Sequence, residues 1–288
     1  MSGYQSRLRG RDALVALGCV LFAFLTLGAI GEGGRRRAKE IVCQSNLRQW
    51  HNVFQGYIEQ NDGKFFSGCN DWGYWWPMQL SHEWQDWKRN RTWFCPTATT
   101  PVWNEAGVPK QSLYVTDAWG IVKPSMPGVW WSMAYQGKTY SLNPNGLNGS
   151  YGLNGYMLSI PENGTYEGGV PAADGFPDML NVKNADEIPV MLDALRFDLW
   201  PQETDGPAIN EFEFWVARAY YSMVKVCINR HGGAVNCLFV DGSVRKVGLK
   251  ELWTLKWHKS FDTAGPWTTA GGVQPEDWPE WMREFRDY

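Results

Sequence analysis

Residues 13–30 read ALVALGCVLFAFLTLGAI, a run without a charged side chain in which only Thr26 is clearly polar. As a helix this run is about 27 Å long, because each residue adds about 1.5 Å, and the hydrocarbon core of a bilayer is about 30 Å thick. We therefore expect residues 13–31 to form one transmembrane helix with membrane lipid as its partner. Residues 1–12 form a leader ahead of it.

A secretory signal peptide is the alternative interpretation of this run. Basic residues precede it and small residues follow it, as they do in a signal peptide. The run is longer than the apolar part of a signal peptide, which has about 7–15 residues, and Arg35, Arg36 and Arg37 resemble a stop-transfer flank. The positive-inside rule does not orient the span, because arginines lie on both of its sides.

Residues 32–63 are expected to form an amphipathic helix. From Arg36 to Gln60 apolar residues recur at spacings of four and three, which places on one helical face Cys43, Leu47, Trp50, Phe54 and Tyr57. Asn61-Asp62-Gly63 is a turn signal that ends the helix. An apolar stripe needs a partner surface, and a sheet farther along the chain is the expected one.

Residues 64–288 read as an α+β domain in which this helix packs on an antiparallel sheet with long ordered loops. Turn-forming Gly, Pro and Asn recur every few residues in the segment 101–180. A short helix is expected from Trp76 to Trp87, and an amphipathic helix from Leu249 to Phe261. Ile188–Asp193 reads as a buried strand that ends in a carboxylate.

Three antiparallel strands are expected near the end of the chain, at Met223–Asn229, Ala234–Val240 and Ser243–Val247. Asp241-Gly242 is a type I′ hairpin signal, so we interpret Asp241 as a turn residue. His231 lies at the other end of the middle strand, about 23 Å away at 3.3 Å per residue. His231 and Asp241 are therefore not expected to share a ligand.

The cysteines outside the span are odd in number and include no Cys-x-x-Cys pair. This argues against a cysteine-based metal site. We expect a disulfide between Cys43 and Cys95, because Cys43 lies on the inner face of the amphipathic helix and Cys95 opens a Cys-Pro turn after an aromatic segment. The alternative is that each is a small buried hydrophobic residue.

Composition and motifs exclude several functions. A net charge of −3 provides no basic surface for nucleic acid. The sequence contains no Gly-x-Ser-x-Gly elbow, no P-loop and no His-Glu-x-x-His motif, and its histidines have no metal-ligand spacing. We therefore expect no enzyme, no cofactor and no metal ion.

Several sequence blocks carry a resemblance to one known family. The blocks are Cys43–Trp50 with Tyr57 and Asp62–Lys64, Phe94–Ala98, Ser150–Gly155, Arg230-His231 to Asp241–Val244, and Leu249–His258. Together they resemble the prepilin-type, pseudopilin-like proteins of type II secretion in planctomycetes, over nearly the whole chain. The resemblance implies a pilin-like fold, a cytoplasmic N-terminus, and a single-pass protein of the cytoplasmic (inner) membrane with its C-terminal domain outside. It also implies assembly with other pseudopilin subunits.

The leader departs from the family's pattern at two positions. In the family a basic leader ends in Gly, cleavage and methylation follow before a Phe, and a Glu four residues after that Phe guides assembly. Gly10 matches, but Arg11 stands in place of the Phe and Val15 in place of the Glu. We therefore expect a chain that is uncleaved at Gly10 and mostly monomeric or in small complexes in detergent.

The resemblance favours a structural or assembly component of a type II secretion or type IV pilus-like system. The alternative is a membrane-anchored binding protein whose aromatic rings stack on glycans or peptides, since the chain contains 18 tryptophans. Buried tryptophans would favour the assembly component. Tryptophans exposed beside carboxylates would favour the binding protein.

Overall fold

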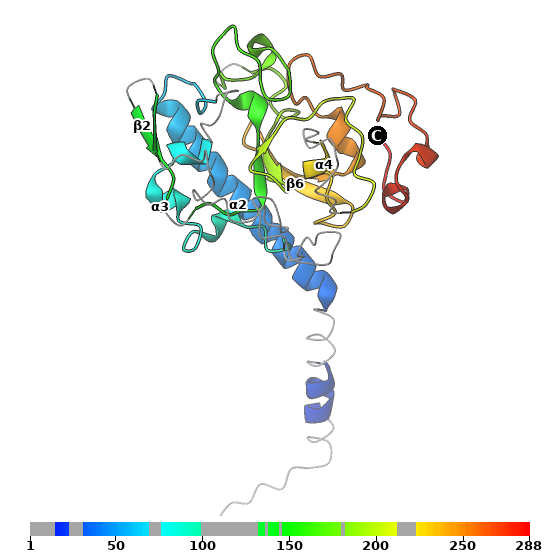
Figure 1. The fold of residues 1–288 in the computed structure, drawn as a ribbon. Helices are drawn as coiled ribbons and strands as arrows, with labels where there is room; N and C mark the ends of the chain where they lie inside the picture. The colour runs from blue at the N-terminus through cyan, green and yellow to red at the C-terminus, as the bar shows by residue number, and fades with distance from the viewer. Residues whose placement is uncertain are drawn as a thin grey trace, which may run out of the picture.

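A computed structural model describes residues 15–22, 31–68, 76–98, 132–135, 138–143, 146–179, 182–211 and 223–288. It has a mixed α+β fold, in which one long helix lies against a five-stranded sheet (Figure 1). The α-helices are α2 Glu32–Glu59, α3 His82–Gln85 and α4 Met223–Val226, and residues 15–22 are also helical. The 3-10 helices are η1 Trp76–Gln79, η2 Arg91–Trp93, η3 Gly155–Met157, η4 Ala172–Asp174, η5 Lys250–Thr254, η6 Pro275–Asp277 and η7 Glu280–Met282.

The main sheet has the strand order β5-β3-β4-β6-β7. Its strands are β3 Tyr151–Asn154, β4 Pro189–Asp193, β5 Asp198–Leu199, β6 Ala234–Phe239 and β7 Val244–Gly248, and a separate hairpin pairs β1 Ser132–Tyr135 with β2 Lys138–Ser141. All neighbours in the main sheet are antiparallel except β3 and β5. The chain reverses after β4, so β5 runs parallel to β3. The predicted antiparallel sheet is therefore mixed.

Helix α2 packs on the sheet at β6 and β7 and extends out of the domain at its N-terminal end (Figure 1). Every residue from Glu32 to Val42 is exposed except the half-buried Glu40. The buried stripe begins at Cys43 and consists of Cys43, Asn46, Leu47, Trp50, Phe54 and Ile58. The predicted amphipathic face is thus confirmed at four of its positions, whereas Tyr57 is only partly buried.

Tryptophan rings form much of the core beside α2. Trp50 is fully buried, and its ring centroid lies 4.6 Å from that of Trp93 and 5.6 Å from that of Trp76. The indole N–H of Trp50 donates to the carbonyl oxygen of Thr92 at 3.1 Å, and that of Trp76 to the carbonyl oxygen of Phe197 at 2.8 Å. These bonds satisfy polar groups that would otherwise be costly to bury.

Three predicted strands are confirmed, with shifts of one residue at their ends: β4, β6 and β7. The hairpin between β6 and β7 has a different turn from the expected type I′. Only Gly242 has a positive φ, 82°, and the amide of Ser243 donates to the carboxylate of Asp241 at 2.9 Å. The loop is therefore a three-residue turn with glycine in the left-handed position. Asp241 is a turn residue, as predicted.

The predicted strand at Met223–Asn229 is wrong. Its first residues form α4, and no strand follows before β6. Strand β6 is already paired with β4 on one side and β7 on the other, so it has no free edge for a third partner. The segment instead accepts a hydrogen bond at the carbonyl of Lys225 from the amide of Leu195, at 2.8 Å.

The two predicted helices in the aromatic segments are also shorter than expected. Only η5 forms within Leu249–Phe261, because the amide of Lys256 donates to Glu187 across the fold at 3.0 Å and does not continue the helix. The segment from Trp76 to Trp87 divides into η1 and α3 at Ser81, whose hydroxyl caps α3. The expected packing of the C-terminal tail is confirmed, since Trp278 and Met282 are buried.

The predicted membrane span is described only at residues 15–22, and the leader with Gly10 and Arg11 lies outside the described residues. Among the helices that the structure describes, none is both long and apolar enough to cross a bilayer.

Two glycines provide a matched test of this packing. A Cβ added to Gly56 of α2 meets no atom within 4 Å, so we expect Gly56→Ala to stabilise the domain by about 1 kcal/mol through its higher helix propensity. A Cβ at Gly152 of β3 meets the carbonyl of Arg196 and the side chain of Leu199, so Gly152→Ala should destabilise by about 1–3 kcal/mol. Urea unfolding followed by tryptophan fluorescence measures both changes. If both variants changed the free energy of unfolding in the same direction, the packing around Gly56 or Gly152 would differ from that described.

Candidate functional site

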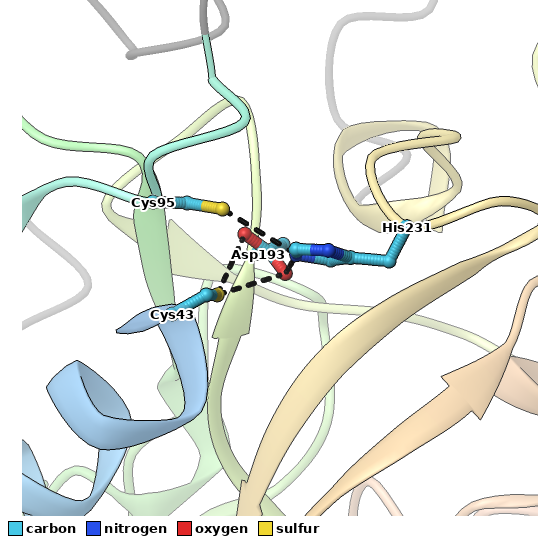
Figure 2. A group of neighbouring side chains, drawn as sticks. All are labelled: Cys43, Cys95, Asp193 and His231. Atoms are coloured by element: carbon cyan, nitrogen blue, oxygen red, sulfur yellow. Dashed lines mark hydrogen bonds and ion pairs between the residues drawn. The ribbon is translucent and has the colours of Figure 1, made fainter. Parts of the chain in front are cut away.

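Four titratable side chains from distant parts of the sequence meet beside the N-terminal part of the buried helix. They are Cys43, Cys95, Asp193 and His231, and one donor atom from each lies within 4.8 Å of the others (Figure 2). All four residues are buried. Among the residues that the structure describes, this is the one group of three or more His, Cys, Asp or Glu side chains with such a spacing.

Each side chain is held by a different structural element. Cys43 is the first buried residue of α2, and Asp193 is the last residue of β4. Cys95 follows η2, and its amide donates to the hydroxyl of Ser150 at 2.6 Å. His231 precedes β6, and its amide donates to the carbonyl of Ala234 at 3.0 Å across the glycine turn. A helix, two loops and a strand end therefore converge on one point.

The donor atoms are close to one another. Nε2 of His231 lies 3.1 Å from Oδ2 of Asp193 and 3.4 Å from Sγ of Cys95. Sγ of Cys43 lies 3.7 Å from Oδ2 and 3.8 Å from Oδ1 of Asp193. In Figure 2 the two sulfur atoms and the imidazole point toward the carboxylate.

A second layer of polar groups surrounds the four residues. Nη1 of Arg230 lies 3.3 Å from Oδ1 of Asp193, and the guanidinium also donates to the carbonyls of Ser150 and Ala194. The amide of Asn236 donates to Oδ2 of Asp193 at 2.9 Å. The hydroxyl of Tyr151 donates to Sγ of Cys43 at 3.3 Å. The negative charge of the Asp193 carboxylate is thus compensated by Arg230 at Oδ1 and by the amide of Asn236 at Oδ2.

The charge states follow from these contacts. Burial opposes ionisation of Asp193, but its hydrogen bond to His231, together with Arg230, keeps its pKa below the ordinary value. Burial also opposes protonation of His231, yet Asp193 and Cys95 raise its pKa to about 10.

The two thiols differ from each other. Burial, with Cys95 and Asp193 nearby, raises the pKa of Cys43. Burial also tends to raise the pKa of Cys95, but hydrogen bonds with Cys43 and His231 outweigh this effect and lower the pKa to about 6. Cys95 is therefore the more acidic of the two thiols.

A Cys-His-Asp catalytic triad does not fit this geometry. In such a triad the nucleophile and the carboxylate contact different nitrogens of the imidazole, so that a proton can pass between them. Here Cys95 and Asp193 both contact Nε2 of His231. Cys95 is also only 2% exposed. The arrangement suits two other kinds of chemistry: ligation of a metal ion by thiolate, imidazole and carboxylate, or oxidation of the two thiols to a disulfide.

The predicted disulfide partners are neighbours in the structure, but both are present as free cysteines. The disulfide therefore stays a prediction. It excludes metal ligation by the same two residues, because a sulfur atom in a disulfide is no longer a thiolate ligand. Of the other predicted site residues, Asp241 and Gly242 lie in the β6–β7 turn, away from this group, whereas His231 belongs to it.

Sequence reasoning did not predict this group as a metal-ligating set, because the absence of a Cys-x-x-Cys pair and of histidine spacing argued against one. Cys43 and Asp193 are 150 residues apart, and Cys95 and His231 are 136 residues apart. The available signals were separate: a cysteine on a buried stripe, a Cys-Pro turn, and a carboxylate at the end of a buried strand. No protein-family model, curated protein or solved structure matches the chain.

Proposed function

We propose that the chain is a membrane-anchored, pilin-like subunit that acts as a structural or assembly component of a type II secretion or type IV pilus-like system. One observation carries this proposal: helix α2 is embedded in the domain from Cys43 onward, and its part before Cys43 projects from the domain (Figure 1). A pilin-like subunit needs such a helix, since the embedded part holds the globular domain and the projecting part is available to lipid and to neighbouring subunits.

Apolar side chains are exposed on the projecting part. Ile41 and Val42 are 57% and 48% exposed, at the point where α2 leaves the domain. In the helical residues 15–22, Val15, Leu17, Val20 and Leu21 are all more than half exposed. An apolar surface of this kind is unfavourable in water and favours contact with lipid or with another helix.

The burial of tryptophan argues against the alternative, a glycan- or peptide-binding protein. Within the described ranges no tryptophan is exposed, and the fully buried ones include Trp50, Trp76, Trp93, Trp253, Trp257 and Trp278. Rings that stack on a ligand need an open face. The assembly component is therefore the better supported of the two functions.

The anchor can be tested by membrane fractionation of cells that express the full chain. We expect the unaltered chain in the membrane fraction, resistant to a high-salt wash and released by detergent. The double variant Leu17→Arg/Leu21→Arg should move to the soluble fraction, because each arginine near the centre of a span costs about 2.5–3.5 kcal/mol. An unaltered chain that is washed off by salt would overturn the anchor.

A matched double variant separates anchoring from assembly. Ile41→Arg/Val42→Arg lies outside the apolar run, so the chain should stay in the membrane fraction. If α2 contacts neighbouring subunits, this variant should lose the cross-links to pilin-like proteins that the unaltered chain forms in intact cells. Absence of such cross-links for the unaltered chain would refute the assembly role.

A further inference from the structure

We propose that Cys43, Cys95, Asp193 and His231 together bind one zinc ion, in a closed site that fastens α2 to the sheet. This inference goes beyond the proposed function and does not depend on it. It rests on the spacing of the four donor atoms, on their chemical types, and on the polar groups that surround them (Figure 2).

The spacing is that of a tetrahedral site. Zinc lies about 2.3 Å from sulfur and about 2.0–2.2 Å from nitrogen or oxygen, so two of its ligands in a tetrahedron are about 3.3–3.8 Å apart. Three of the six separations are 3.7 Å from Sγ of Cys43 to Oδ2 of Asp193, 3.4 Å from Sγ of Cys95 to Nε2 of His231, and 3.1 Å from that nitrogen to Oδ2, and all six are within 4.8 Å. Small shifts of side chains bring all three to tetrahedral values.

The donor set selects zinc among the common ions. Two thiolates are too soft for calcium or magnesium, which take oxygen ligands. A carboxylate and an imidazole beside them suit zinc, which accepts sulfur, nitrogen and oxygen in one site. All four ligands come from the protein, and each is buried, with at most 6% of the residue exposed. A site with four protein ligands and no open position is structural in type.

The formal charges balance. Two thiolates and one carboxylate contribute three negative charges, and zinc with the guanidinium of Arg230, 3.3 Å from Asp193, contributes three positive ones. The imidazole of His231 would lose its proton on binding zinc and is counted as neutral. A buried site of this kind is stable only when its charges are compensated.

The surrounding hydrogen bonds are of the kind that orients metal ligands. The amide of Asn236 holds Oδ2 of Asp193, the hydroxyl of Tyr151 holds Sγ of Cys43, and the amide of Cys95 is held by Ser150. Binding would replace the present contacts of Nε2 of His231, which lies 3.0 Å from Nδ2 of Asn236, 3.1 Å from Oδ2 of Asp193 and 3.4 Å from Sγ of Cys95. Four metal–ligand bonds would take the place of these contacts.

The position of Cys43 shows what such an ion would do. Cys43 is the first buried residue of α2, at the junction between the projecting part of the helix and the domain. The other three ligands belong to the sheet and to loops beside it. A zinc ion at this point would fix the direction in which the helix leaves the domain.

The experiment uses the full chain, purified in detergent without chelators. We expect one zinc ion per chain by elemental mass spectrometry, and an X-ray absorption spectrum with two sulfur neighbours at about 2.3 Å and two lighter neighbours. Cobalt(II) in place of zinc should give the intense visible bands of a tetrahedral thiolate site. A chain that is purified metal-free and gains no mass with added zinc in native mass spectrometry would overturn the proposal.

Variants identify the ligands. Cys95→Ala should lose at least nine-tenths of the bound zinc, whereas Cys227→Ala, which removes another buried thiol in contact with Met282, should retain it. His231→Cys should keep the ion and strengthen the sulfur-to-cobalt charge-transfer bands, because a third thiolate replaces the imidazole. This change of spectrum keeps the test valid where Cys95→Ala does not fold.

Oxidation is the competing outcome. A peptide map of the chain, alkylated before lysis, that shows a Cys43–Cys95 disulfide would also overturn the zinc site. Metal content and disulfide state are measured independently of membrane fractionation, so failure of the zinc site and failure of the proposed anchor are distinguishable.

Discussion

Replacement of Arg230 by methionine is expected to destabilise the folded domain by about 3–5 kcal/mol, the usual cost of removing one partner from a buried ion pair. Asp193 is fully buried and would lose the guanidinium 3.3 Å from its carboxylate. The carbonyls of Ser150 and Ala194 would lose a donor in the same step. Urea unfolding followed by tryptophan fluorescence measures the change.

Arg245→Met is the matched control. Arg245 pairs with Glu251 at 2.6 Å, but its side chain is 42% exposed, so the loss should be about 1 kcal/mol or less. Equal costs for Arg230→Met and Arg245→Met would show that burial of the first pair has no energetic consequence.

Replacement of Trp50 by alanine should also cost about 3–5 kcal/mol, the range for removing a large aromatic side chain from a core. Trp50 is fully buried at the centre of the aromatic cluster, with the rings of Phe54, Trp76, Trp84 and Trp93 around it. A cavity of this size cannot close, because the neighbouring indoles are held by their own hydrogen bonds. Thermal unfolding by circular dichroism gives the measurement.

Two further variants in α2 test whether the loss of stability is specific to the buried ring of Trp50. Trp50→Phe keeps an aromatic ring and gives up the 3.1 Å hydrogen bond to Thr92, so it should be less harmful than Trp50→Ala. Ile41→Ala changes a residue that is 57% exposed and should alter stability by no more than about 0.5 kcal/mol. If Ile41→Ala proved as costly as Trp50→Ala, the projecting part of α2 would have to pack on the domain.

Patterns that depend on neighbours in the chain were predicted well from the sequence. The spacing of Cys43, Leu47, Trp50 and Phe54 identifies the buried face of α2, because a helical repeat brings those positions together whatever the rest of the fold is. The apolar run before Asp193, and the pattern on both sides of Asp241-Gly242, identify β4, β6 and β7 for the same reason.

Choices that depend on competition between distant segments were not predictable in this way. Met223–Asn229 has the composition of a strand, but β4 occupies the edge of β6 that it would need. Leu249–Phe261 has helical spacing, but a backbone bond to Glu187 draws Lys256 away from the helix. In each case a long-range hydrogen bond replaced the local one that the pattern predicts, and local propensity does not contain that information.

The same distinction between local patterns and long-range contacts applies to the candidate site. The sequence by itself determined that Cys43 faces inward from a helix and that Asp193 ends a buried strand, since both follow from local periodicity. Only the tertiary structure brought them to Cys95 and His231, from positions as far apart in the chain as Cys43 and His231. A group of side chains brought together from four separate segments has no short motif, because its spacing is set by how the helix crosses the sheet and not by the repeat of any one element.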